Sequence, residues 1–116
     1  ILADLEVEMP RIYIANPRHG KIYFNNNARK NIEQYYPIVF DDINLYAEVK
    51  QGLYPIDRVE FYYGKRLIFT DMEKPYEYLL NKRSVRRHTI KAVVYDIAGN
   101  NAVDEMELFF LNIKKR

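Results

Sequence analysis

The chain has 116 residues, a formal net charge of +2 and no cysteine. Its length fits a single domain with one hydrophobic core, and the lack of cysteine excludes disulfides, thiolate metal sites and a cysteine nucleophile. The near balance of 18 basic and 16 acidic residues gives no electrostatic reason to expect nucleic acid as a partner. No apolar run approaches the roughly 20 residues of a membrane span, so we expect no membrane insertion by this segment.

Runs in which apolar and polar residues alternate follow one another along most of the chain. Such a period of two, rich in Val, Ile, Tyr and Phe, is typical of strands with one buried face. The predicted strands are Arg11–Ile14, Lys21–Phe24, Ile43–Val49, Arg58–Tyr63, Arg66–Phe69, Tyr76–Leu80, His88–Asp96 and Glu105–Leu111. Seven or eight short strands without a long helix predict an all-β domain, and the long connections favour a Greek-key β-sandwich over a barrel or a meander.

The connections between these runs carry signals of their own. The Pro17–Gly20 connection is interpreted as a kink that lets an edge strand switch sheets. Asn25–Asn27 predicts a polar loop, and Ala28–Tyr36 is compatible with one helical turn that Pro37 ends. Asn81–Arg87 is predicted to be a loop.

We expect the sandwich to span residues 10–113. Residues 1–9 are interpreted as a linker or the tail of a preceding domain, and residues 114–116 as a basic linker or tail. Because the chain begins with Ile1 and not with Met, we expect it to be part of a longer protein.

The stretch His88–Asn100 shows the strand pattern most clearly. Its alternation predicts that Ile90, Ala92 and Val94 face the core. The segment D-I-A-G-N then supplies turn chemistry, because Gly and Asn tolerate left-handed backbone and Asp96 can accept hydrogen bonds from the amides ahead of it. The stretch is therefore predicted to be a central strand followed by a tight reversal.

Three segments carry recognisable motifs. Ile56–Lys65 follows the pattern I-x-x-V-E-F-Y-x-x-G-K, Thr70–Tyr78 follows T-D-x-x-x-P-Y-x-W with Tyr78 at the last position, and His88–Asn100 follows H-T-I-K-V-x-A-Y-D-x-A-G-N. In this order they resemble bacterial and archaeal immunoglobulin-like (Big-type) domains, over about residues 10–113. The resemblance implies an immunoglobulin-like Greek-key β-sandwich of seven to eight strands.

The same resemblance implies a non-catalytic module of a multidomain protein that is secreted or attached to the cell surface, in an extracellular or cell-envelope location. Such modules act as spacers, as adhesive units or as contacts between domains. The implied partners are neighbouring domains of the same chain or another surface protein. The alternative is a carbohydrate-binding accessory module of a secreted hydrolase, with polysaccharide as its partner.

No residue pattern predicts a catalytic, cofactor or metal site. His19 and His88 are far apart in the chain, and the aspartates near predicted turns form no D-x-D-x-D calcium loop; they are Asp41, Asp42, Asp57, Asp71, Asp96 and Asp104. Glu105 and Glu107 lie two apart on a strand, about 7 Å, which overlaps the carboxylate spacing of inverting glycosidases. Because such neighbours point the same way, a solvated face is favoured over a hydrolase.

The candidate interaction residues are aromatic or apolar and lie on the outward positions of three predicted strands. If these strands share a sheet, its outer face carries Tyr62, Val93, Tyr95 and Phe109. A contiguous exposed apolar patch marks an interaction surface. Two interpretations stay open: the patch is a binding face, or the insertion at residues 25–37, which is longer than the family pattern, folds over it and covers it.

Overall fold

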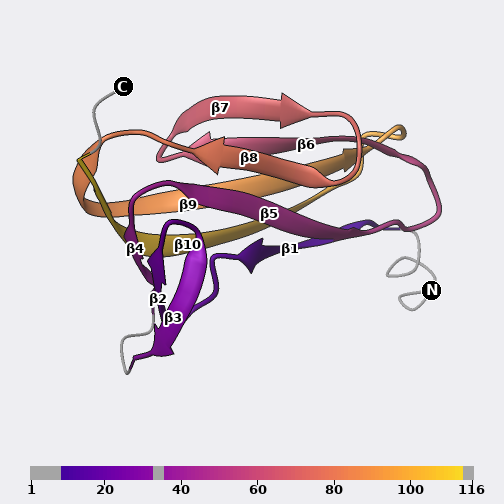
Figure 1. Cartoon of the computed structure of the whole chain (residues 1–116). Helices are drawn as coiled ribbons and strands as arrows, with labels where there is room; N and C mark the ends of the chain where they lie inside the picture. Colours follow the sequence, from indigo (N-terminus) through magenta and orange to yellow (C-terminus); the bar gives the residue numbers. More distant parts are fainter. Residues whose placement is uncertain (1–8, 33–35, 114–116) are drawn as a thin grey trace.

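A computed structural model describes residues 9–32 and 36–113, which form ten strands and no helix. The strands are β1 (Arg11–Asn16), β2 (Lys21–Phe24), β3 (Asn27–Asn31), β4 (Ile38–Phe40), β5 (Ile43–Lys50), β6 (Ile56–Tyr63), β7 (Arg66–Asp71), β8 (Tyr76–Leu80), β9 (Ser84–Asp96) and β10 (Asn101–Asn112) (Figure 1). Within the described ranges no helix could cross a membrane. The predicted all-β fold is confirmed.

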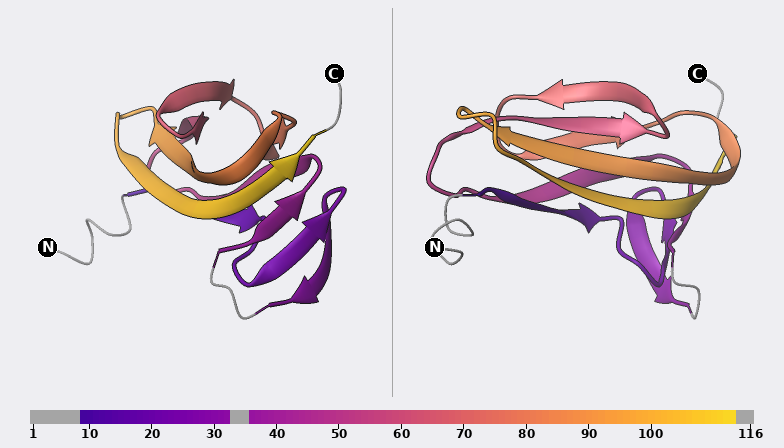
Figure 2. Two further views of the ribbon diagram at one scale, coloured as in Figure 1. Left: turned by 90° about the vertical axis from the view of Figure 1, so that its left-hand side faces the viewer. Right: turned by 180° about the vertical axis from the view of Figure 1, so that it is seen from behind.

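The strands form two sheets that pack against each other (Figure 2). The small sheet has the order β1-β5-β8, and the large sheet has the order β3-β2-β4-β10-β9-β6-β7. Strands that are far apart in the sequence, such as β1 and β5, pair because the chain crosses between the sheets. This is the predicted sandwich, with β9 in the interior of the large sheet as expected for the His88–Asn100 stretch.

The chain changes sheets between β1 and β2, as the Pro17–Gly20 kink predicts. β1 pairs with β5 in the small sheet, whereas β2 pairs with β3 and β4 in the large one. Gly20 has a φ of 72°, a left-handed conformation that costs glycine little.

The insertion differs from the prediction. Residues Asn27–Asn31 form β3, a strand, and not the start of a helical turn. Asn25 and Asn26 have φ values of 49° and 67°, so they make a two-residue turn of the left-handed kind that closes a hairpin between β2 and β3. Residues 33–35 of the expected helical turn lie outside the described residues.

Two further differences raise the number of strands and lengthen one of them. Ile38–Phe40 forms β4, which runs parallel to both β2 and β10 and joins the hairpin to the large sheet. β9 begins at Ser84, so the predicted loop Asn81–Arg87 is in fact mostly strand, paired with the end of β10. The expected linkers at residues 1–8 and 114–116 lie outside the described ranges.

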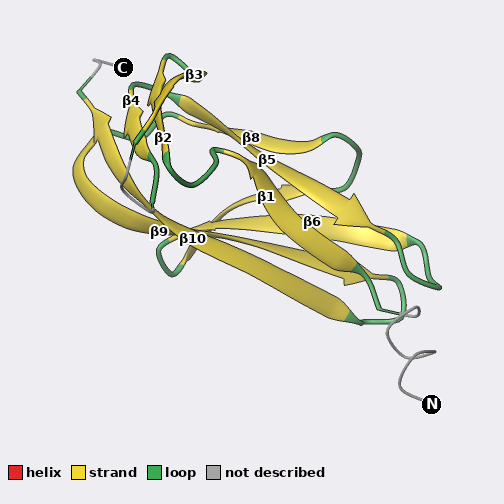
Figure 3. Ribbon diagram, turned by 90° about the horizontal axis from the view of Figure 1, so that it is seen from below, coloured by secondary structure: helices red, strands yellow, loops and turns green. Residues whose placement is uncertain are grey.

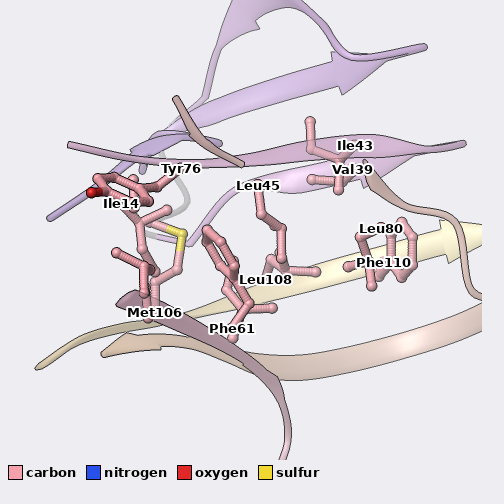
Figure 4. Packing of buried hydrophobic residues seen from close by; sticks show 14 of the residues in the cluster. Ile14, Val39, Ile43, Leu45, Phe61, Tyr76, Leu80, Met106, Leu108 and Phe110 are labelled. Carbon is pink, nitrogen blue, oxygen red and sulfur yellow. The ribbon is translucent and has the colours of Figure 1, made fainter. Parts of the chain in front are cut away.

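The core lies between the two sheets and consists of the inward positions of the alternating runs (Figure 4). Ile90, Ala92 and Val94 are buried, as their alternation predicts. Phe61 and Phe110 are the largest of the fully buried side chains and come from β6 and β10 of the large sheet. Residues of β5 such as Leu45 and Ile43 meet them from the small sheet.

The reversal after β9 is held by Asp96, whose carboxylate is buried. One oxygen, Oδ1, accepts hydrogen bonds from the backbone amides of Ala98 (3.0 Å) and Asn100 (2.9 Å), and Oδ2 accepts one from the side chain of Asn100 (2.9 Å). Gly99 completes the turn with a φ of 87°. The turn chemistry predicted for this segment is confirmed.

Candidate interaction face

Three of the four candidate residues lie together on the outer face of the large sheet. β10, β9 and β6 are neighbours in the large sheet. The three predicted strands therefore share one sheet, as the predicted outer face requires. Across β6 and β9, Arg58 is opposite Tyr95, Glu60 is opposite Val93 and Tyr62 is opposite Lys91. Residues opposite each other in an antiparallel pair share a face. We call the group Arg58, Glu60, Tyr62, Lys91, Val93 and Tyr95 the Tyr62/Tyr95 face.

Phe109 lies elsewhere on the same sheet. Val93 is opposite Val103 on β10, and Phe109 comes six residues after Val103, or about 20 Å along the strand. There it lies between Arg87 of β9 and Ile38 of β4. The four residues therefore do not form one contiguous patch.

The described end of the insertion packs near Phe109. The backbone amide of Phe109 donates a hydrogen bond to the carbonyl of Pro37 (3.0 Å), and the guanidinium of Arg87 lies 5.1 Å from the ring centroid of Tyr36. Tyr35 lies outside the described residues. These contacts of Tyr36 and Pro37, which belong to the described part of the insertion, are thus at the Phe109 end of the sheet.

The Tyr62/Tyr95 face is a polar network and not an apolar patch. Val93 is only 6% exposed beneath its neighbours. Arg58 forms ion pairs with Asp57 (2.6 Å) and Glu60 (3.1 Å), and the hydroxyl of Tyr62 donates to Glu60 (2.8 Å). This hydrogen bond, with a smaller effect of burial, raises the pKa of Tyr62.

Cations occupy one face of each tyrosine ring in this network. The guanidinium carbon of Arg58 lies 4.0 Å from the ring centroid of Tyr95, and the ammonium of Lys91 lies 4.4 Å from that of Tyr62. A cation at this distance is attracted to the ring by about 0.5–1 kcal/mol at an exposed site. A sugar ring that stacked on either tyrosine from that side would have to displace the cation.

Glu105 and Glu107 project from β10 beside a shallow cavity. The cavity has a volume of about 270 Å³ and its lining includes His19, Tyr36 and Thr89 besides the two glutamates. Glu107 lies 4.0 Å from Arg87, and both side chains are more than half exposed. Both glutamates come from the same strand face, so among the described residues no carboxylate opposes another across this cavity as glycoside hydrolysis requires.

Asp71 and Asp104, like Asp96, accept hydrogen bonds from backbone amides. Asp104 accepts from the amide of Ile14 (2.8 Å), which links β10 to the small sheet. Asp71 accepts from the amides of Glu73 and Glu77 before β8. Within residues 9–32 and 36–113 no group of three or more His, Asp or Glu side chains is arranged to hold a metal ion.

His88 is a packed residue of β9. Its ring stacks on Tyr63 with 4.3 Å between centroids, and Nε2 is 2.6 Å from the hydroxyl oxygen of Ser84. Burial lowers the pKa of His88, and the nearby positive charge of Arg86 lowers it further. The folded protein therefore favours the neutral imidazole.

This pKa predicts a loss of stability in mild acid. Because the pKa of His88 is lower in the folded state, the unfolded chain binds the proton more readily, and stability falls as the pH drops through the unfolded value near 6.5. Urea unfolding at pH 7.5 and pH 5.5 measures the fall, and each tenfold difference in proton affinity contributes about 1.4 kcal/mol. His88→Gln should flatten this slope and His19→Gln should not; equal slopes in both variants would contradict the assignment.

The small sheet carries a second aromatic surface, which lies outside the four candidate residues. Tyr13 of β1 is 57% exposed and is opposite Glu48 of β5, and the hydroxyl of Tyr46 donates to Glu48 (2.9 Å). The signal was present in the sequence, because Tyr46 and Glu48 occupy the outward positions of the run Ile43–Val49. The sequence does not indicate which strands lie beside these two residues.

No protein-family model matches the chain, and no curated protein matches it either. Among solved structures, the fibronectin(III)-like modules of CbhA from Clostridium thermocellum match 89% of this chain and 99% of that chain, with a TM-score of 0.65 and 19% identity. The fold is that of a fibronectin(III)-like sandwich. An engineered protein matches 88% of this chain over 20% of its own length, with a TM-score of 0.56 and 15% identity. At these identities the likeness establishes the immunoglobulin-like sandwich fold alone.

Proposed function

We propose that this chain is a non-catalytic module of a larger secreted or cell-surface protein, in which it holds neighbouring domains apart and contacts one of them. The likeness to structures that are themselves named as fibronectin(III)-like modules supports a modular role. The three sequence motifs support a Big-type module and an extracellular or cell-envelope location. Fold likeness alone does not specify a function, so the geometry of the chain ends carries the proposal.

The described chain enters and leaves the sandwich at opposite ends of its long axis. The principal extents are 48 × 31 × 22 Å. β1 begins at one end of the long dimension, and β10 runs to the other (Figure 1). A rigid sandwich traversed in this way would separate a domain attached before β1 from one attached after β10 by nearly the length of the module.

The Tyr62/Tyr95 face is the surface that we assign to domain contact. Contacts between domains of one chain resemble transient protein interfaces, which are more polar than permanent ones. Half-buried tyrosines beside paired charges fit this description, since tyrosine and arginine are enriched in interfaces. The alternative role of this face, stacking of a polysaccharide on Tyr62 and Tyr95, is less favoured because Lys91 and Arg58 occupy the ring faces.

The spacer role is tested by a distance measurement. The chain contains no cysteine, so Met9→Cys with Ile113→Cys allows spin labels to be attached at two defined sites. We expect one narrow distance distribution comparable with the 48 Å long dimension, because both sites adjoin paired strands. A broad distribution centred at short distances would contradict the proposal.

A matched pair of labels at one end provides the control. Ile97 lies in the turn between β9 and β10, 63% exposed, and its amide bonds to the carbonyl of Pro55 (3.0 Å). Labels at Met9→Cys and Ile97→Cys should give a clearly shorter distance. Similar distances for both pairs would show that the chain ends are not held at opposite ends of the module.

A further inference from the structure

We propose that the outer surface of the small sheet around Tyr13 and Glu48 binds an acidic polysaccharide. This inference goes beyond the spacer role and concerns a different surface from the Tyr62/Tyr95 face. It rests on three observations: two adjoining cavities, tyrosine rings without a covering cation, and cations without an ion-pair partner among the described residues.

Two cavities adjoin at Glu48 and Val49 of β5. One has a volume of about 330 Å³ and extends from Tyr46 and Glu48 toward Pro75. The other has a volume of about 390 Å³ and extends from Glu48 and Val49 toward Tyr13 of β1. Both cavities are open to solvent and share Glu48 and Val49 as lining residues, and we call the pair the Glu48 groove.

The pairing of the strands explains why the groove is open. β8 begins at Tyr76, opposite Ala47 of β5. β5 continues to Lys50 and remains paired with β1 on its other side, since Lys50 is opposite Arg11. The last three residues of β5 therefore have a strand on one side only, and β1 and β5 run side by side toward this end (Figure 3).

The tyrosines of the groove differ from those of the Tyr62/Tyr95 face. Tyr13 is 57% exposed and has no ring or cation contact with the described residues. The hydroxyl of Tyr46 is fixed by its hydrogen bond to Glu48, a contact that is the main cause of the raised pKa of Tyr46. An exposed tyrosine offers an apolar ring face with a polar rim, which suits the C–H faces and the hydroxyls of a sugar.

The charges around the groove select for an anion. Arg11, Lys50 and Lys74 line it and are exposed, and none of the three forms an ion pair with the residues that the structure describes. Among the described residues that line either cavity, Glu48 is the one acidic side chain. In contrast, Arg58 on the other face is neutralised by two carboxylates. Within the described part of the chain, three cations without an ion pair face one carboxylate, which complements a polymer that carries repeated negative charges.

Glu48 favours an acidic polysaccharide over DNA. Its carboxylate is an acceptor in the middle of the groove, and sugar hydroxyls are donors that can bind it. A DNA strand is also charged at every unit, but its sugars have no free hydroxyl along the chain that could donate to Glu48. A carboxylated polysaccharide supplies both hydroxyls for Glu48 and charged groups for the cations on either side.

Calorimetric titration with polygalacturonate tests the site. We expect binding that weakens as the salt concentration rises, because the cation contacts are exposed to solvent. Arg11→Ala with Lys50→Ala and, separately, Tyr13→Ala should each lower the affinity at least tenfold, whereas Tyr13→Phe should retain it. A neutral glucan and a thymidine oligonucleotide should both bind more weakly than polygalacturonate.

Two control variants separate this site from general attraction. Arg29→Ala with Lys30→Ala removes the same charge from β3, where both side chains are exposed, and Tyr62→Ala removes a ring from the other face. Both should bind polygalacturonate within twofold of the unmodified chain. The proposal is overturned if the two charge variants lose affinity equally, if the neutral glucan or the oligonucleotide binds as tightly, or if nothing binds. The label distances of the spacer test do not depend on any of these outcomes.

Discussion

Replacing Phe61 by alanine is expected to lower the free energy of unfolding by about 3–5 kcal/mol. Phe61 is 1% exposed and lies between the two sheets, surrounded by other core side chains (Figure 4). The substitution removes the apolar surface that the ring buries and leaves a cavity, because a core formed by two hydrogen-bonded sheets collapses only in part. Domains of this size have a total stability of about 5–15 kcal/mol, so the loss is a large share of the whole.

Urea unfolding followed by circular dichroism measures the change. Tyr13→Ala is the matched control, since it also removes an aromatic ring from a strand, but from a position that is 57% exposed. We expect it to cost less than about 1 kcal/mol, which also keeps the binding test of the Glu48 groove interpretable. Equal losses in the two variants would mean that Phe61 is not in the core.

The core could be predicted because the alternation of side chains along a strand depends only on the backbone. Ile90, Ala92 and Val94 are buried as their spacing requires, and so are Val59 and Phe61. This rule holds whichever strands are neighbours. It therefore identifies the buried face of each strand before the topology is known.

The insertion could not be predicted by the same rule. β3 is exposed at every position, so it has no alternation to detect, and β4 is only three residues long. The decisive signal was the pair Asn25-Asn26, which adopts left-handed backbone and closes a hairpin.

The candidate interaction face could be predicted from the sequence only in part. The sequence places Tyr62, Val93, Tyr95 and Phe109 on outward positions, but it does not give their distances along the strands. The register that separates Phe109 from the others depends on how far β9 and β10 extend, and β9 is longer than its pattern suggested. The cations that cover Tyr95 and Tyr62 also come from opposite positions on the neighbouring strand, which only the pairing determines.

The second large effect is expected at Asp96, where alanine should lower the free energy of unfolding by about 3 kcal/mol. Asp96 is 4% exposed, and its carboxylate accepts three hydrogen bonds inside the reversal between β9 and β10. Alanine would leave the backbone amides of Ala98 and Asn100 without this acceptor, and hydrogen bonds to a charged group contribute about 1.5–3 kcal/mol each. The turn would open at the joint between the two longest strands.

Asp96→Asn separates the two carboxylate oxygens. An amide oxygen in place of Oδ1 still accepts from Ala98 and Asn100, but the amide nitrogen in place of Oδ2 faces another donor, the side chain of Asn100. We therefore expect an intermediate loss of about 1–2 kcal/mol. Asp57→Ala, which removes an exposed partner of Arg58, should cost less than about 1 kcal/mol. If urea unfolding showed Asp96→Ala to be no more destabilising than Asp57→Ala, the hydrogen bonds of Asp96 would not hold the reversal, and the motif that best marks this fold in the sequence would need another explanation.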